Sequence, residues 1–285
     1  MNDMIRREEH GDFLLITQHD HALLAGELAE AFGNGRFASP RPHASAIVGI
    51  AQHDCGWPLH DDEPTLSHEG KPLDVFETTP EIGLKVWTAS ADRASALDPY
   101  AGLMVSLHVL SLSVFATTRT GFVHEKWDLE NPAEKFAVTK FQHREIERQE
   151  KLRMQLGLRT YRPTHHKLPR EAAQKKEDEL TFNFRLLQAM DLVSLAACCT
   201  RPPASQTQEV LEQPGGAALH LDLARAGSDV VVTPWPFAVE LIELKIPAVR
   251  LSARPYESVE AFRAAYTAAD SELVTCRVLP KAPSS

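Results

Sequence analysis

An adjacent histidine and aspartate, His53 and Asp54, end an apolar run of the sequence at residues 44–54 (ASAIVGIAQHD). A neutral imidazole and a carboxylate are common nitrogen and oxygen ligands of divalent first-row cations. The same pair could instead cap the end of a helix. Because two side chains cannot hold an ion tightly, a metal site at this position requires donors from elsewhere in the chain.

Further donors occur on the inward faces of other expected helices. His21 opens the apolar stripe of a helix that stops at Gly33. His108 lies in the apolar run at 100–116, and Asp191 lies among apolar residues of a later helix. A buried ionised aspartate is costly unless a cation, a hydrogen-bond network or a raised pKa compensates. An isolated histidine on an apolar helix, however, is often only a hydrogen-bonded core residue. Together the helices could supply the ligands of a catalytic metal site.

Helical periodicity dominates the first two thirds of the chain. Between residues 55 and 99 the sequence is rich in Pro, Gly and acidic residues and predicts an ordered loop, and loops of this length are often functional. Residues 12–18 (DFLLITQ) fit a strand or the lead-in to a helix. The expected helices are at 19–33, 44–54, 100–116, 131–157 and 177–199.

The last part of the chain has a different character. It is rich in β-branched residues, partly alternating, and punctuated by Pro and Gly, which predicts short strands in a small antiparallel sheet. We therefore expect a mainly α protein. A helical metal-binding domain would occupy residues 1–205, and a β-rich subdomain packed on it would occupy residues 206–285.

Composition and charge exclude several classes of protein. The net charge of −9 and pI near 5.8 argue against nucleic acid as a partner. We expect no membrane-spanning segment, because no stretch approaches the roughly 18 to 20 apolar residues that a bilayer requires. The N-terminus is too charged for a signal peptide. These features predict a cytoplasmic protein with reduced cysteines. The sequence leaves the formation of a homo-oligomer open.

Three short motifs together resemble the HD superfamily of metal-dependent phosphohydrolases and their relatives. They are HALLAGELA at the first core helix, AQHDCG at the end of the second, and MDLVSLA near the end of the helical part. The resemblance implies an all-α, HD-type helical core. It also implies that His21, His53, Asp54 and Asp191 are metal ligands. The wider pattern, which includes HDCGW, SLH and TPWPF, resembles an uncharacterised, mostly bacterial, HD-related family of unknown function.

The activity implied by this resemblance is hydrolysis of a phosphoester in a small molecule. The bound cation would lower the pKa of a water molecule, and the metal-bound hydroxide would attack in line. Asp54 is then expected to take part in catalysis as well as in metal binding. In the following loop, Asp62 is a candidate general acid and Lys71 a candidate contact to an anionic substrate. Trp57 stands where many HD hydrolases have a lysine, which argues against a simple phosphomonoesterase.

The number of metal ions and the kind of chemistry stay open at this point. His108 resembles the extra helix-borne histidine that some HD relatives use for a second metal, and His124 offers another. One or two ions of Mn, Zn, Fe, Ni or Co suit these donors alike. A diiron oxygenase would need both histidines and about six protein ligands in total. A third alternative is a non-catalytic binding or sensor protein that contains a structural metal.

Overall fold

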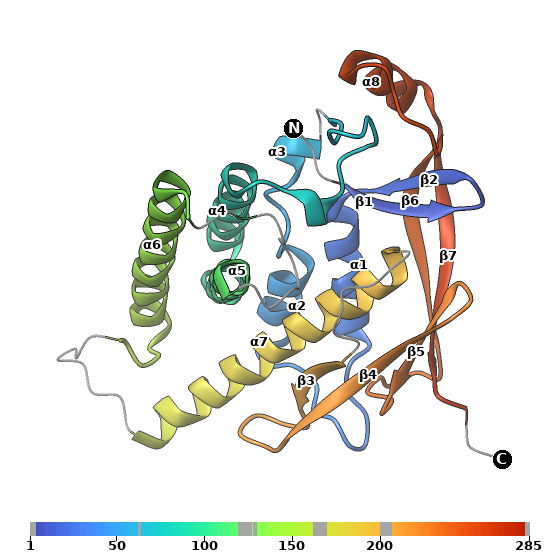
Figure 1. Ribbon diagram of the computed structural model, residues 1–285. Helices are drawn as coiled ribbons and strands as arrows, with labels where there is room; N and C mark the ends of the chain where they lie inside the picture. The colour runs from blue at the N-terminus through green and yellow to red at the C-terminus, as the bar shows by residue number, and fades with distance from the viewer. Residues whose placement is uncertain are drawn as a thin grey trace.

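The computed structural model describes residues 4–61, 64–118, 127, 130–161, 170–199 and 207–282. It consists of a helical layer and a curled sheet beside it (Figure 1). The helices are α1 (Gln18–Glu30), α2 (His43–Ala51), α3 (Pro58–Asp61), α4 (Pro80–Leu97), α5 (Pro99–Thr118), α6 (Pro132–Leu156), α7 (Arg170–Cys198) and α8 (Val259–Ala268), with a 3-10 turn η1 (Val75–Glu77). The strands are β1 (Ile5–Glu9), β2 (Asp12–Ile16), β3 (Thr207–Leu211), β4 (Ala218–Ala226), β5 (Asp229–Thr233), β6 (Ile242–Ser252) and β7 (Ser271–Pro280).

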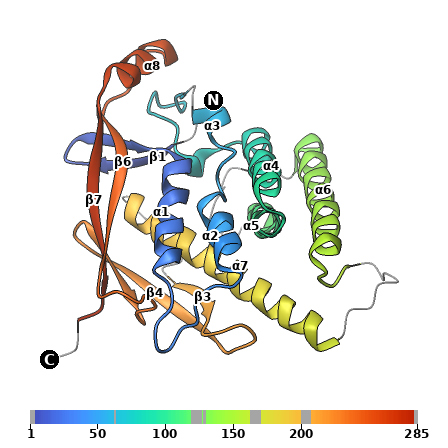
Figure 2. The ribbon, with the colours of Figure 1, turned by 180° about the vertical axis from the view of Figure 1, so that it is seen from behind.

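Helix α5 lies in the middle of the helical layer. It packs against α2, α4, α6 and α7, while α6 lies on the side away from the sheet (Figure 2). Helix α5 is apolar around most of its circumference, which is the composition expected of a helix buried on all sides. The five helices expected from periodicity are all present, and α7 begins earlier than expected, at Arg170.

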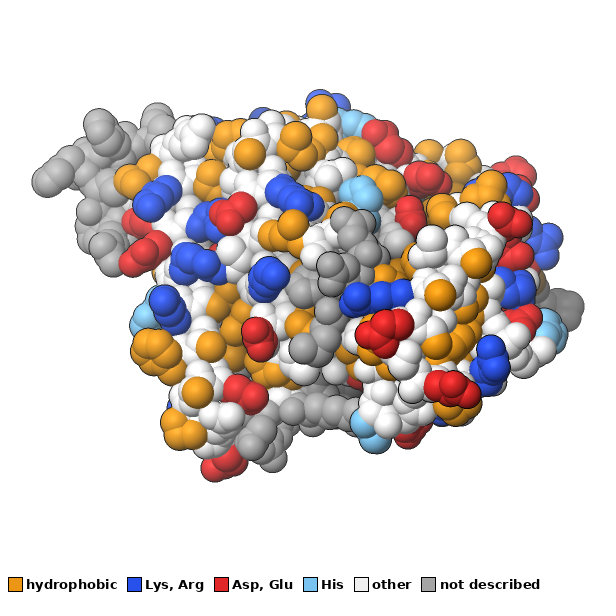
Figure 3. Space-filling model, turned by 90° about the horizontal axis from the view of Figure 1, so that it is seen from above, with side chains coloured by type: hydrophobic (Ala, Val, Ile, Leu, Met, Phe, Trp, Pro, Cys, Tyr) orange, Lys and Arg blue, Asp and Glu red, His pale blue; other side chains and the backbone are white. Residues whose placement is uncertain are grey.

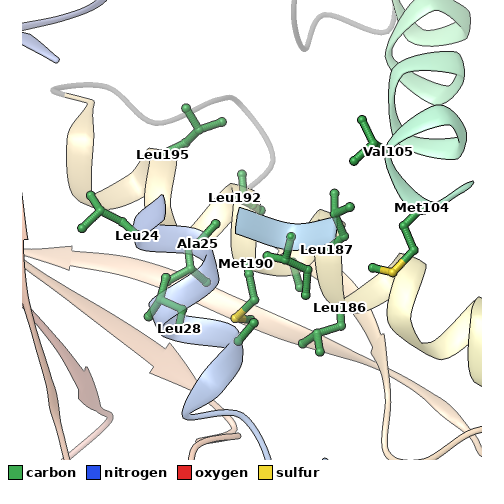
Figure 4. Close-up of a cluster of buried hydrophobic side chains, with 14 of the residues drawn as sticks. Leu24, Ala25, Leu28, Met104, Val105, Leu186, Leu187, Met190, Leu192 and Leu195 are labelled. Carbon is green, nitrogen blue, oxygen red and sulfur yellow. The ribbon is translucent and has the colours of Figure 1, made fainter. Parts of the chain in front are cut away.

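The apolar core joins α1, α5 and α7. Leu24 and Leu28 from α1, Met104 from α5, and Leu187 and Met190 from α7 lie in one cluster (Figure 4), and each is at most 2% exposed. Side chains three or four residues apart share one helix face, so each helix presents a stripe to the others. Burying each side chain of this size contributes about 1.5–3 kcal/mol. This packing sets the positions of three helices that carry candidate donors.

One seven-stranded sheet forms the other layer, in the order β1-β2-β6-β7-β5-β4-β3. Neighbouring strands are antiparallel except β5 and β7, which are parallel. The sheet curls around α1 and α7 (Figure 1): α1 packs on β6, and α7 packs on β3, β4 and β5. The expectation of a mainly α, all-α HD-type core with a small C-terminal antiparallel β region is therefore wrong. The sheet is large and mixed, and two of its strands come from the N-terminus.

The N-terminal hairpin explains why the sheet is larger than expected. Strand β1 has the sequence IRREE, whose charged residues hide a strand signal, although Ile5 and Arg7 are buried. A turn with positive φ at His10 and Gly11 closes the hairpin, and β2 then pairs with β6 near the other end of the chain. The expected domain boundary between residues 205 and 206 lies outside the described residues and stays a prediction, although the sheet has strands from both sides of it.

Helix α4 occupies part of the segment at 55–99 that we expected to be an ordered loop. It begins at Pro80, and proline is favoured in the first turn of a helix. Ile82, Val86 and Ala94 are buried on its inner side, and their spacing is typical of an amphipathic helix. The loop prediction is therefore wrong for residues 80–97, because the Pro- and acid-rich sequence before them obscured a helical pattern.

Helix α5 also corrects the expectation that no segment is long and apolar enough to cross a membrane. Residues Pro99–Thr117 have a mean hydropathy of 1.6 and meet that criterion by length and composition. However, 61% of this window is buried inside the protein, as in the core helix of a soluble protein. The structure is thus compatible with a soluble protein. Seen from above, the surface carries acidic and basic side chains interspersed with apolar ones (Figure 3).

Candidate metal centre

The five candidate donors come from separate parts of the helical layer and meet at one buried point. His21 lies near the start of α1, His53 and Asp54 follow the end of α2, His108 lies in α5, and Asp191 lies in α7. The three histidines are at most 3% exposed, and Asp54 is 6% exposed. The ring of His53 packs edge to face against those of His21 and His108, with centroids 5.0 and 5.3 Å apart. The structure therefore brings together all five residues that the sequence indicated as metal ligands.

Four donor atoms form a closed ring of short contacts. His21 Nε2 is 3.3 Å from Asp54 Oδ2 and 3.6 Å from Asp191 Oδ1. His53 Nε2 is 3.5 Å from each of the same two oxygens. First-row divalent cations bind such atoms at about 2.0–2.2 Å, which sets neighbouring ligand atoms roughly 3.0–3.5 Å apart. The four atoms are therefore spaced as the ligands of a single cation would be.

Hydrogen bonds fix the tautomers of two histidines. His53 Nδ1 lies 2.8 Å from the Ile50 carbonyl oxygen, which can only accept, so the proton is on Nδ1. Ser194 Oγ donates to the Asp191 carbonyl oxygen at 2.8 Å, so it must accept from His21 Nδ1, 2.7 Å away. In both neutral rings Nε2 then carries a lone pair directed at the carboxylates, and His53 Nε2 is buried with no hydrogen-bond partner in the described part of the chain. A cation between these facing lone pairs satisfies them all.

The charge balance of the cluster also requires a positive charge. Burial would raise the pKa of Asp191, but its close contact with His53 and the charges of His53, His108 and His21 hold that pKa well below its usual range. Burial lowers the pKa of His53, but Asp54 and Asp191 outweigh that effect and raise it to about 9. A proton on His53 thus offsets part of the negative charge of the two carboxylates in the absence of a metal, at the position that a cation would otherwise take.

Asp54 is held in place by its own turn and by α4. Trp57 donates from Nε1 to Asp54 Oδ1 at 3.1 Å, which leaves Oδ2 facing the histidines. The Gly56 N–H donates to Ser90 Oγ on α4 at 2.9 Å. A Cβ at Gly56 would lie 2.1 Å from the Val86 carbonyl oxygen, so only glycine permits this approach. The sequence HDCGW and helix α4 together therefore position the carboxylate.

His108 belongs to the cluster but is placed differently. Its Nε2 lies 3.6 Å from Asp191 Oδ2, whereas His21 and His53 face Oδ1 of the same carboxylate. Its Nδ1 is buried and has no hydrogen-bond partner within the described residues. Burial lowers the pKa of His108 to about 4, so the ring is neutral at pH 7. His108 is thus the least constrained of the three histidines.

A cavity of about 50 Å³ opens beside the donors. This volume exceeds the space that one water molecule needs, so the cavity can admit water or a small chemical group next to the cluster. Most of its wall is apolar. Its apolar lining residues are Trp57, Val75, Phe76, Trp87, Leu112 and Leu195, and its polar ones are Gln18, His21, Asp54, His108 and Asp191.

The other predicted site residues do not join the cluster. Lys71 lies 3.0 Å from Glu69 in a surface turn, with 36% of its side chain exposed, and does not line the cavity. Asp62 and His124 lie outside the described residues.

Sequence reasoning missed two residues of the site. Ser194, which orients His21, is three residues after Asp191 on α7. Gln18, which lines the cavity, is three residues before His21 on α1. Residues three apart lie on one helix face, so this spacing was a usable signal once the donors were known.

The fold and the cluster define an α+β protein with a buried His and Asp metal centre as its candidate site. The chain belongs to a family described as a protein of unknown function, DUF3891, whose model matches residues 4–253. The match includes all five donors and the N-terminal strands. Comparisons with curated proteins and with solved structures found no match. The family description carries no activity.

Proposed function

We propose that this protein is a metal-dependent hydrolase that acts on a small phosphorylated molecule. The observation that carries the proposal is the convergence of two histidine Nε2 atoms and two carboxylate oxygens, 3.3–3.6 Å apart along the ring, beside a cavity. The resemblance of the surrounding motifs to the HD superfamily also supports it, and that resemblance stays a prediction. Phosphoesters are the first substrate class to test for that reason.

In this proposal His21, His53, Asp54 and Asp191 hold one divalent ion of Mn, Zn, Fe, Ni or Co. When bound, such a cation supplies Lewis acidity and lowers the pKa of a coordinated water molecule. The residues around the donors keep both imidazoles and the Asp54 carboxylate oriented before a ligand arrives. The apolar cavity wall keeps the local dielectric low, which strengthens each electrostatic interaction with a bound substrate.

One ion suits the described residues better than two. A diiron oxygenase would need about six protein ligands, whereas five donor residues gather among the residues described here. His108 and Asp191 Oδ2 are the pair on which a second ion would depend, and no hydrogen bond within the described residues orients His108 through its Nδ1. We therefore favour hydrolysis over oxygenation. A non-catalytic binding protein would hold the ion equally well, and turnover separates it from a hydrolase.

We also propose a cytoplasmic location without nucleic acid or membrane as a partner. The net charge of −9 disfavours polyanions, and the one helix of sufficient length and hydropathy among the described residues is mostly buried. Formation of a homo-oligomer stays a prediction.

Metal content of the purified protein tests the ligand set. We expect about one first-row metal ion per chain, and a loss of at least about 90% of it in Asp54→Ala, since one of four ligands is gone. Asp270→Ala removes an exposed carboxylate at the end of α8 and should leave metal content unchanged. Circular dichroism should show the same helix content in all three proteins. Full metal occupancy in Asp54→Ala would overturn the ligand set.

Turnover tests the activity. The metal-loaded protein is assayed with p-nitrophenyl phosphate and bis(p-nitrophenyl) phosphate in the presence of Mn²⁺, Zn²⁺, Fe²⁺, Ni²⁺ or Co²⁺. We expect hydrolysis of at least one ester by the parent protein and by Asp270→Ala, and none by Asp54→Ala. A protein that binds metal and hydrolyses neither ester with any of these ions would favour a binding role over the hydrolase.

A further inference from the structure

Gln18 is a buried polar side chain that the metal centre does not use. It is the first residue of α1, it is 3% exposed, and it lines the cavity beside the donors. Its Nε2 is buried and has no hydrogen-bond partner in the part of the chain that is described. A buried donor without an acceptor is unfavourable, and such groups in native proteins require an explanation.

Gln18 lies on the same helix as His21, one of the metal-ligand candidates. It lies three residues before His21, so both side chains are on one face of α1, one turn apart. His21 contacts both Asp54 and Asp191, so Gln18 lines the cavity from the same helix that supplies a central donor. A ligand that occupies the cavity beside the donors therefore meets the Gln18 side chain as well.

The rest of the cavity wall indicates what kind of ligand would fit. Trp57, Trp87 and Phe76 are among the apolar residues that line it. A group bound there needs an oxygen that accepts a hydrogen bond and a small apolar part that packs on these rings. A phosphoryl group that carries a small alkyl substituent has both the acceptor oxygen and the apolar part.

We propose that Gln18 is a substrate-binding residue whose Nε2 donates a hydrogen bond to a phosphoryl oxygen of a small alkyl phosphoester. This inference rests on the proposed function and names the substrate group that the same site takes. The amide is kept unpaired in the free protein because its acceptor belongs to the substrate. Polar groups of this kind favour ligand binding at the expense of stability.

The test uses methylphosphonate as the probe and isothermal titration calorimetry of the Mn²⁺-loaded protein. Gln18→Leu should bind methylphosphonate about tenfold more weakly than the parent protein, since one hydrogen bond is lost. Its affinity for Mn²⁺ should stay within about twofold, because Gln18 is not one of the four ligands. Its Tm should equal or exceed that of the parent protein, since the buried unpaired amide is gone.

Gln149→Leu is the matched control. Gln149 is also fully buried, and its Nε2 has no hydrogen-bond partner among the described residues, but it lies on α6, accepts a hydrogen bond from Tyr161 and does not line the cavity. Its replacement should leave methylphosphonate affinity unchanged. Gln18→Met, which is close in shape to glutamine, repeats the measurement in case leucine does not fit.

Two outcomes would overturn this inference while the metal centre stands. One is a Mn²⁺-loaded parent protein that binds methylphosphonate no better than Gln18→Leu and Gln18→Met, including no binding by any of them. The other is a clear fall in Tm in both variants, which would make Gln18 a structural residue. Failure of the parent protein to bind any metal would instead refute the proposed function.

Discussion

Two buried carboxylate sites in the helical layer are satisfied in opposite ways. Glu145 on α6 is fully buried, and its Oε2 accepts hydrogen bonds from Ser106 Oγ and Arg148 Nε, both at 2.9 Å. Arg148 also contacts Asp92 at 2.6 Å. The negative charge of Glu145 is therefore balanced by a guanidinium group of the chain itself, which is always protonated.

Asp54 and Asp191 face imidazoles instead. The positive charge of an imidazole depends on a proton, and two of these rings direct an unprotonated nitrogen at the carboxylates once their other nitrogen is hydrogen-bonded. The charge of a carboxylate paired with arginine is balanced without a bound ligand. A pair of carboxylates that faces neutral imidazoles leaves room for an exchangeable cation. The difference in partner separates a structural ion pair from a candidate binding site.

The largest expected effect on stability comes from breaking the structural pair. Glu145→Ala should lower the free energy of unfolding by about 3 kcal/mol, because it leaves Arg148 partly buried with Asp92 as its only remaining acidic partner among the described residues. Urea denaturation of the metal-free protein measures this change. Glu147→Ala, on the exposed side of the same helix, should change it by less than about 0.5 kcal/mol. A fall in metal content in Glu145→Ala would contradict the separation of the two sites.

A third buried carboxylate, Asp74, extends the comparison of buried carboxylates with a test of how stability depends on pH. It accepts hydrogen bonds from the backbone N–H groups of Arg6 and Phe76, and burial raises its pKa to about 6 despite them. The folded protein then holds this proton more tightly than the unfolded chain does. The contribution to stability is present below about pH 4 and is lost as the pH rises to about 6.

This loss should reach at most about 3 kcal/mol, which is the stability equivalent of the rise in pKa. Urea unfolding of the parent protein and of Asp74→Asn at pH 4, 5, 6 and 7 measures it as the difference between the two. We expect the parent protein to lose stability relative to the variant over this range. Parallel profiles would show that Asp74 does not titrate in the window.

The smallest expected effect concerns the orientation of His21, one of the proposed metal-binding residues. Ser194→Ala removes the hydrogen bond that fixes His21, and should weaken Mn²⁺ binding about tenfold with all four ligands still present. Ser113→Ala is the control, since Ser113 is a buried helical serine that donates to the Leu110 carbonyl outside the cluster. Competition with a metallochromic indicator measures both. Equal affinities in the two variants would mean that the His21 tautomer needs no support from Ser194.

The donors could be found from sequence, whereas much of their environment could not. His21, His108 and Asp191 each interrupt an apolar helical stripe, and this pattern can be recognised from nearby residues alone. Lys71 was chosen only because it follows the His-Asp pair in the chain, and the structure places it beside Glu69 at the surface. Gln18 could not be singled out in advance, because a glutamine at the start of a helix is ordinary until the cavity beside it is known.

The sequence by itself determined five of the helices, their inward faces and the types of donor that those faces carry, because helical periodicity is a property of residues three and four apart. Only the tertiary structure decided that β1 and β2 join the C-terminal strands, that α4 supports the turn at Gly56, and that Ser194 and Ile50 set the two tautomers. Strand pairing joins distant parts of the chain. The tautomers depend on where each ring nitrogen lies once the helices have packed.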